Sequence, residues 1–216
     1  MKTRIAPSIL SADFAALAAA IDRVAPEADL LHVDVMDGHF VPNLTIGPPV
    51  VASLRKHTDL YFDCHLMIDN PAELLDDFAE AGADGCSVHV ELGDVGDLIE
   101  QMRQLGLDVG LAVNPETPFE ACEAYLGDID LLLLMTVHPG FAGQEFMPEV
   151  MDKVHQARAE LDGRNLGVAL QVDGGINEHT GAIAAAAGAD VFVSGSAIFH
   201  APDPLEAARR LRAAVV

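Results

Sequence analysis

The stretch LLHVDVMDGHF, residues 30–40, decides the fold class because it reads as a buried strand with two different faces. Alternate residues of a strand point to opposite sides, and even positions here carry His32, Asp34 and Met36 between apolar neighbours. In a barrel of parallel strands, one face packs against helices, the other points inward, and chemistry collects where the strands end. The stretch therefore predicts a barrel strand that brings ionisable groups to the interior.

Runs of strand character continue along the whole chain and alternate with helical stretches. The predicted strands span residues 4–10, 30–36, 60–67, 85–91, 108–113, 130–137, 167–173 and 190–196. Helical stretches between them include SADFAALAAAIDRV, NPAELLDDFAEAG and NEHTGAIAAAAG. The steps AGADGCSV and AGADVFVS lie about half a chain apart, which indicates a repeated half-barrel. Eight β-α units without a linker predict one α/β domain over residues 1–216, a (β/α)8 TIM barrel in preference to a doubly wound sheet.

Composition and charge narrow the possible partners. Half of the 216 residues are hydrophobic, which is typical of a well-packed globular protein. The 12 basic residues face 34 acidic ones, so the net charge of -22 would repel nucleic acids and anionic membranes. We therefore expect neither a nucleic acid nor a membrane as a partner.

The cysteines and the N-terminal segment predict a cytoplasmic protein. Cys64, Cys86 and Cys122 are odd in number and show no CxxC spacing, which argues against disulfides and against a thiolate zinc site. The segment MKTRIAPSILSADF lacks the apolar core of a signal peptide, and no apolar run approaches the roughly 18 residues of a membrane span. A reducing cytosol fits these features best.

Four ionisable residues fall late in predicted strands, at positions that a closed barrel would bring together. They are His32, Asp34, His65 and Asp173. Buried carboxylates need a partner, and a mixed set of imidazole and carboxylate ligands suits Zn²⁺, Mn²⁺, Fe²⁺ or Co²⁺. The pattern predicts one divalent metal ion at the mouth of the barrel.

The remaining histidines receive no ligand role. His89 also lies late in a strand, and we expect it to support a ligand or to pack in the core. The others lie in predicted loops or helices: His39, His57, His138, His155, His179 and His200.

Glycine-rich segments follow the last three strands, at residues 138–146, 173–177 and 194–199. Barrels of this class commonly hold phosphate with backbone N–H groups from the loops after strands 7 and 8, where small residues let the anion approach. The segments predict a phosphate-binding barrel that needs no lysine. Beside them, Met36, Met67 and Met135 are predicted to form a polarizable wall that excludes water from a charged intermediate.

The metal and the two aspartates together predict an epimerase. A divalent metal bound by a ketone and its neighbouring hydroxyl makes the adjacent C–H acidic, because it stabilises the enediolate formed on proton loss. Asp34 and Asp173 lie on separate strands and are suited to flank a planar intermediate, one removing the proton and the other returning it on the opposite face. One aspartate must then be ionised and the other protonated in each turnover.

Six segments carry a resemblance to a known family, in this chain order: PSILSADF, HVDVMDGHFVPNLTIGP, DCHLMI, HPGFAGQEF, VDGGIN and SGSAIF. Together they resemble the ribulose-phosphate 3-epimerase family over essentially the whole chain. The resemblance implies that the chain interconverts D-ribulose 5-phosphate and D-xylulose 5-phosphate, in the pentose phosphate pathway or the Calvin cycle. It also implies one divalent ion (Zn, Fe(II), Mn or Co) and a homo-oligomer, either a dimer or a hexamer.

The resemblance also implies roles for individual residues. It makes His32, Asp34, His65 and Asp173 the metal ligands, with Asp34 and Asp173 as the acid/base pair. The residues that it places against the substrate are Ser8, His65, Gly140, Phe141, Ala142, Gly143, Gly174, Gly175, Gly195 and Ser196. One departure is HPGFAGQ, which reads NPGFGGQ in most of the family. Ala142 would be strained there if its φ were positive, and His138 adds a titratable group.

Three alternatives remain open at this point. A 3-epimerase of a hexulose 6-phosphate such as D-allulose 6-phosphate needs only a longer pocket. Orotidine-phosphate decarboxylase shares the barrel, but its D-x-K-x-x-D pattern is missing here, since the comparable strand reads DVMDG without lysine. A sugar-phosphate-binding barrel without catalysis would have been free to lose its ligand set, which this chain retains in full.

Overall fold

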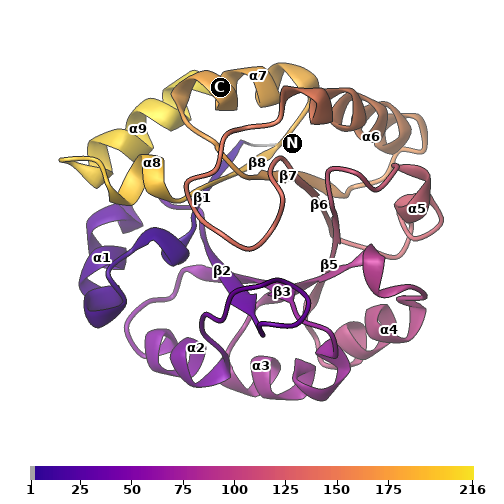
Figure 1. Ribbon diagram of the computed structural model, residues 1–216, viewed down its shortest axis with the longest axis horizontal. Helices are drawn as coiled ribbons and strands as arrows, with labels where there is room; N and C mark the ends of the chain where they lie inside the picture. The colour runs from indigo at the N-terminus through magenta and orange to yellow at the C-terminus, as the bar shows by residue number, and fades with distance from the viewer. Residues whose placement is uncertain (1–2) are drawn as a thin grey trace.

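The computed structural model describes residues 3–216 as a closed barrel of parallel strands surrounded by helices, as Figure 1 shows. The eight strands form one sheet in the order β1-β8-β7-β6-β5-β4-β3-β2. A parallel bridge between Ser8 and His32 joins its two edges just beyond β1. The predicted (β/α)8 barrel is therefore confirmed. None of the helices within the described part of the chain combines the length and apolar character needed to cross a membrane.

The strands are β1 Arg4–Pro7, β2 Leu30–Met36, β3 Tyr61–Met67, β4 Gly85–His89, β5 Asp108–Val113, β6 Leu131–Met135, β7 Ala169–Asp173 and β8 Val191–Ser194. The α-helices are α1 Leu17–Val24, α2 Pro48–Arg55, α3 Leu75–Ala81, α4 Gly96–Gln104, α5 Glu120–Glu123, α6 Met151–Gly163, α7 Glu178–Ala187, α8 Ser196–Phe199 and α9 Pro204–Ala214. Short 3-10 turns are η1 Ile9–Ser11, η2 Phe14–Ala16, η3 Ala25–Glu27, η4 Pro71–Glu73, η5 Val90–Leu92 and η6 Pro148–Val150.

The main core lies between the barrel and its ring of helices. Helix α1 buries Leu17, Ile21 and Val24, one face of the helix, against the outward side chains of the strands. Burial of each such side chain contributes roughly 1.5–3 kcal/mol to folding. The apolar face read from the sequence of β2 belongs to this layer, so its alternate residues are free to point into the barrel.

Helix α7 shows how local sequence sets the ends of these elements. The Asn177 side chain accepts hydrogen bonds from the backbone N–H groups of His179 and Thr180, and the Thr180 hydroxyl accepts one from Asn177 N–H. This reciprocal capping starts the helix, and Gly188 ends it with a left-handed φ of 109°. The loop after β7 is therefore held close to the end of its strand.

Several predicted strands end earlier in the structure than the sequence indicated. The run 4–10 stops at Pro7, because the Ser8 side chain accepts from Leu10 N–H and begins a 3-10 turn. The run 85–91 stops at His89, where another 3-10 turn leads to Gly93 with a φ of 103°. β6, β7 and β8 are likewise shorter than predicted. The predicted helix that follows β1 begins its α-helical part only at Leu17, after a turn capped by Asp13.

Candidate functional site

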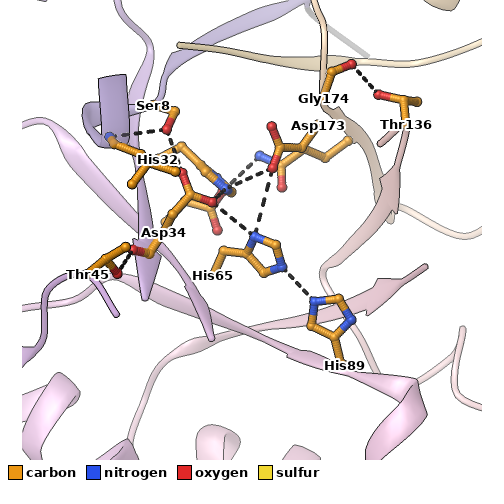
Figure 2. Close-up of polar contacts among 12 residues, drawn as sticks. Ser8, His32, Asp34, Thr45, His65, His89, Thr136, Asp173 and Gly174 are labelled. Atoms are coloured by element: carbon orange, nitrogen blue, oxygen red, sulfur yellow. Dashed lines mark hydrogen bonds and ion pairs between the residues drawn. The ribbon is translucent and has the colours of Figure 1, made fainter. Parts of the chain in front are cut away.

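Four ligand atoms from three strands converge inside the carboxyl end of the barrel, as Figure 2 shows. His32 Nε2 lies 3.4 Å from Asp34 Oδ1 and 3.7 Å from Asp173 Oδ2. His65 Nδ1 lies 3.3 Å and 3.9 Å from the same two oxygens. All four atoms lie within 4.8 Å of one another. The side chains that the sequence analysis selected as ligands are thus brought together.

The cluster fits a small divalent cation. Bonds of about 2.1 Å to a tetrahedral zinc-like ion would separate neighbouring ligand atoms by about 3.4 Å, close to the observed spacings. His32 Nε2 faces the other three ligand atoms of the cluster. It is buried and has no hydrogen-bond partner among the described residues. Such an orphaned nitrogen beside two carboxylates is the donor set that a divalent metal satisfies.

The ring of His32 is fixed from behind by Asp63, which the sequence analysis did not select. Asp63 Oδ2 lies 2.8 Å from His32 Nδ1 and also accepts from Gln171 Nε2 at 2.8 Å. Asp63 and Gln171 are buried, and His32 and Gln171 hold the pKa of Asp63 below its usual range against the effect of burial. An ionised Asp63 accepts the proton of His32 Nδ1, which leaves Nε2 as the metal-facing nitrogen. The signal for Asp63 was its position on β3, two residues before His65 and on the same face.

Asp34 is oriented by groups from the first and second loops. The Ser8 hydroxyl donates to Asp34 Oδ2 at 2.5 Å, and the Thr45 hydroxyl donates to the Asp34 carbonyl at 2.7 Å. Oδ1 is thereby left for the cluster. Ser8, expected to touch the substrate, also lines the cavity described below.

The two aspartates differ in acidity although they share one site. Burial would raise the pKa of Asp34, but the imidazoles of His32 and His65 hold it far below its usual range. Burial and the neighbouring negative charge of Asp34 raise the pKa of Asp173 to about 7. Burial lowers the pKa of His65 to about 4, whereas the carboxylates of Asp34 and Asp63 outweigh burial and raise the pKa of His32. Without a metal, bound protons on His32 and Asp173 therefore offset the negative charge of the carboxylates.

A cavity that is partly open to solvent lies directly over Asp34 and Asp173. Among the residues that line it are Ser8, Met36, Met67, Met135, Gly140, Phe141, Ala142, Gly143, Gly174, Gly175, Gly195 and Ser196. No lysine or arginine contributes to this lining. The loop between β6 and α6 reaches over the barrel opening beside it (Figure 1). His65, which was expected to touch the substrate as well, is fully buried and does not line the cavity.

The glycines after β7 allow two loops to meet at one side of the cavity. Gly174 and Gly175 have φ values of 123° and 65°, and a Cβ on Gly175 would lie 2.6 Å from Phe146 N. Nearby backbone N–H groups of Gly175, Gly195 and Ser196 donate no hydrogen bond to another group within residues 3–216. These N–H groups are available to an anion in the cavity.

Two expectations about the loop after β6 can be compared with the structure. Ala142 does not have a positive φ, since Asn165 is the sole non-glycine residue within 3–216 that does. The condition for strain at Ala142 is therefore not met, and Gly140 and Gly143 take the positive φ values in this loop. His138 lies at the exposed edge of the mouth, with Nδ1 2.7 Å from Glu116 Oε1.

Known proteins resemble this chain in sequence and in fold. The model of the family described as Ribulose-phosphate 3 epimerase family matches residues 4–199. Ribulose-phosphate 3-epimerase of Mycobacterium tuberculosis is 51% identical over 213 residues, covering 96% of this chain and 91% of the relative. The cytoplasmic isoform of the same enzyme from Oryza sativa is 47% identical, covering 98% and 94%. A crystal structure of 3-hexulose-6-phosphate synthase, 22% identical with a TM-score of 0.74 and full coverage of both chains, shares the fold.

Proposed function

The chain belongs to the ribulose-phosphate 3-epimerase family and is an isomerase, and on that premise we propose how its residues carry out the reaction. The proposed reaction interconverts D-ribulose 5-phosphate and D-xylulose 5-phosphate by inverting C3. It uses one divalent metal ion and the pair Asp34 and Asp173. The observation that carries the proposal is the convergence of these carboxylates with two imidazoles under a cavity that is partly open to solvent.

Asp34 and Asp173 act as the two proton carriers. They project from β2 and β7, which are separated in the barrel by β1 and β8, so they approach the cavity from different sides. In one direction of the reaction Asp34 accepts the C3 proton as a carboxylate, and Asp173 returns a proton to the opposite face as an acid. The reverse reaction starts with these protonation states exchanged.

His32, His65, Asp34 and Asp173 would hold the metal ion. When bound, the ion acts as a Lewis acid that stabilises the negative charge of an enediolate formed by loss of the C3 proton. Asp63 keeps His32 in the tautomer that the site needs, and Ser8 keeps one oxygen of Asp34 turned toward the cluster. Zn²⁺, Fe²⁺, Mn²⁺ and Co²⁺ all suit this mixed ligand set.

The substrate phosphate binds at the far side of the cavity, to backbone N–H groups of Gly175, Gly195 and Ser196. The free N–H groups and the small residues around them support this assignment. The chain carries a large negative charge and places no cationic side chain in the lining, so the anion is held by backbone dipoles. Met36, Met67 and Met135 line the same cavity and would exclude water from the charged intermediate.

We also propose a cytosolic location and a homo-oligomeric assembly. The three cysteines are free and buried, and the rice relative is named as a cytoplasmic isoform, which supports the location. Assembly as a dimer or hexamer rests on the family resemblance, and sedimentation of the purified chain tests it.

Exchange of the C3 hydrogen of D-ribulose 5-phosphate in D₂O tests the mechanism. The native protein should incorporate one deuterium at C3 as xylulose 5-phosphate forms, because each aspartate exchanges its proton with solvent between turnovers. Absence of exchange during turnover would overturn the enediolate mechanism. Turnover of D-allulose 6-phosphate in the same assay decides between pentulose and hexulose phosphate as the preferred substrate.

A further inference from the structure

A second hydrogen-bonded line runs from the cluster toward the surface on the side away from His32. His65 Nε2 lies 2.8 Å from His89 Nε2, and His89 Nδ1 lies 2.9 Å from Glu91 Oε2. Figure 2 shows the first of these contacts, with the two imidazoles end to end. Both rings are fully buried, whereas the Glu91 side chain is 20% exposed. This hydrogen-bonded line connects a candidate metal ligand, through a second imidazole, to a carboxylate. Packing of the core alone does not require such a connection.

The chemistry of the groups fixes the direction of every hydrogen bond in the line. His65 must offer the lone pair of Nδ1 to the cluster, so a neutral His65 carries its proton on Nε2. That N–H can only donate to a His89 Nε2 without a proton, and His89 must then carry its own proton on Nδ1. The Glu91 carboxylate accepts that proton, since an ionised carboxylate has no donor. The opposite direction would aim two lone pairs at each other at the 2.9 Å contact.

Glu91 is itself anchored as an acceptor. Its Oε1 accepts from Asn114 N–H at 2.8 Å, and Lys153 Nζ donates to the carbonyls of Asn114 and Pro115 at 2.7 Å and 3.0 Å. The Lys153 ammonium thus holds the loop that holds the carboxylate. Partial burial raises the pKa of Glu91, but hydrogen bonds from His89, Thr117 and the Asn114 N–H outweigh it and lower the pKa to about 2.

The middle ring of the line is locked in place by packing. The centroids of the His89 and His65 rings are 5.0 Å apart and the ring planes differ by 25°, which agrees with their end-to-end contact through Nε2. The Phe40 ring also packs against His89, with the two centroids 4.7 Å apart and the ring planes tilted by 48°. A buried ring that packs against Phe40 and is hydrogen-bonded through both nitrogens cannot rotate to exchange them without breaking these contacts. His89 therefore transmits a preference set at Glu91 to His65.

We propose that Glu91 is a positioning residue of the metal site: acting through His89, it fixes His65 as the tautomer whose Nδ1 lone pair faces the cluster. The proposal rests on the metal site described under the proposed function. Each candidate ligand imidazole then has a carboxylate that sets its tautomer. Asp63 contacts His32 directly, whereas Glu91 acts on His65 through His89. Glu91 touches neither metal ligand oxygens nor the cavity lining.

The substitution Glu91→Gln tests the proposal because it keeps shape and removes one acceptor. A glutamine presents one acceptor and one donor, so it cannot accept from both His89 and Asn114. Accepting from Asn114 would turn its NH₂ toward His89, reverse both imidazole bonds and put a proton on His65 Nδ1. We expect Co²⁺ or Zn²⁺ to bind about 10- to 100-fold more weakly to E91Q, by competition with a chromophoric chelator.

Glu116→Gln is the matched control. Glu116 also pairs with a histidine at the mouth of the barrel, since its Oε1 lies 2.7 Å from His138 Nδ1, but that histidine is not connected to the cluster. E116Q makes the same change in charge and in shape. Its affinity for the metal should stay within about twofold of the native value, so equal losses in E91Q and E116Q would overturn the proposal and indicate a general charge effect.

Tautomers measured directly in the native chain decide the question even if E91Q fails to fold. In ¹⁵N-histidine-labelled protein with Zn²⁺, long-range ¹H–¹⁵N spectra should show His65 protonated on Nε2 and His89 protonated on Nδ1. A His89 protonated on Nε2, or an E91Q variant that binds metal like the native protein, would overturn the proposal. Failure of the native chain to bind Zn²⁺ or Co²⁺ at all would instead remove the proposed metal site, and this inference with it.

Discussion

Asp34 and Asp173 project from strands separated by two others in the barrel, yet their carboxyl oxygens belong to one cluster within 4.8 Å. Burial and this proximity together raise the pKa of Asp173, because burial disfavours its charged form and the negative charge of Asp34 repels a second one. Asp34 receives the compensating imidazoles and ionises, while the pKa of Asp173 rises to about 7. In the metal-free site, one of two residues of the same type is therefore ionised while the other titrates near neutral pH.

Asp34→Asn and Asp173→Asn should each lower kcat by at least about 10²- to 10⁴-fold, because each removes a proton carrier. Each also removes a candidate ligand, so turnover is measured at saturating metal and the bound metal is quantified in the same sample. Circular dichroism should show an unchanged fold. A variant that retains metal and turns over at more than about a tenth of the native rate would contradict the acid/base pair.

Asp63→Asn should weaken metal binding about 10- to 100-fold, since the asparagine NH₂ can donate to His32 Nδ1 and push the proton onto the metal-facing Nε2. Competition titration with Zn²⁺ measures the loss. Asp108→Asn is the control: Asp108 Oδ2 accepts from the Tyr61 hydroxyl at 2.7 Å, at the opposite end of β3 from the cluster. An equal effect of D63N and D108N would show that Asp63 acts on stability and not on His32.

The convergence of the four candidate ligands could be predicted from sequence because it depends on strand parity and on barrel closure alone. His32, Asp34, His65 and Asp173 lie on inward faces, and the structure brings these faces together. Asp63 also lies at an inward position of β3, but its role depends on the hydrogen bond to His32 on the neighbouring strand β2. Which of several inward polar residues meet is decided by side-chain rotamers and register, which no local pattern encodes.

Strand ends were predicted less well because single side-chain contacts decide them. Hydrophobic character continues past Pro7, but the Ser8 hydroxyl captures the N–H of Leu10 and turns the chain. Similarly, the line from His65 through His89 to Glu91 follows a strand end where the backbone enters a 3-10 turn, so parity no longer predicts where Glu91 points. The alternation of residues along the strand therefore could not predict a role for Glu91.

Metal affinity should rise with pH, because protons on Asp173 and His32 compete with the metal. The raised pKa of Asp173 means that its protonated form adds stability to the metal-free chain at low pH, and that this contribution is lost as pH rises through about 7. The metal needs the ionised form, so the apparent affinity for Co²⁺ should increase at least about tenfold from pH 5.5 to 6.5. Calorimetry in buffers of different ionisation enthalpy should detect proton release at pH 6 that decreases by pH 8. A pH-independent affinity would contradict the assignment of Asp173 as a ligand.

Gly175→Ala should weaken binding of the phosphate group while the metal affinity stays unchanged. The new Cβ would lie 2.6 Å from Phe146 N, and the φ of 65° is unfavourable for alanine, so the two loops must move apart and carry the Gly175 N–H with them. We expect KM for ribulose 5-phosphate and the dissociation constant of inorganic phosphate to rise about tenfold or more, with the free energy of unfolding reduced by about 1–3 kcal/mol. Gly163→Ala serves as the control, since a Cβ at this end of α6 meets nothing within 4 Å and the substitution should leave all three quantities nearly unchanged. If G175A instead lowers metal affinity and leaves phosphate binding intact, the phosphate does not sit at the loop after β7.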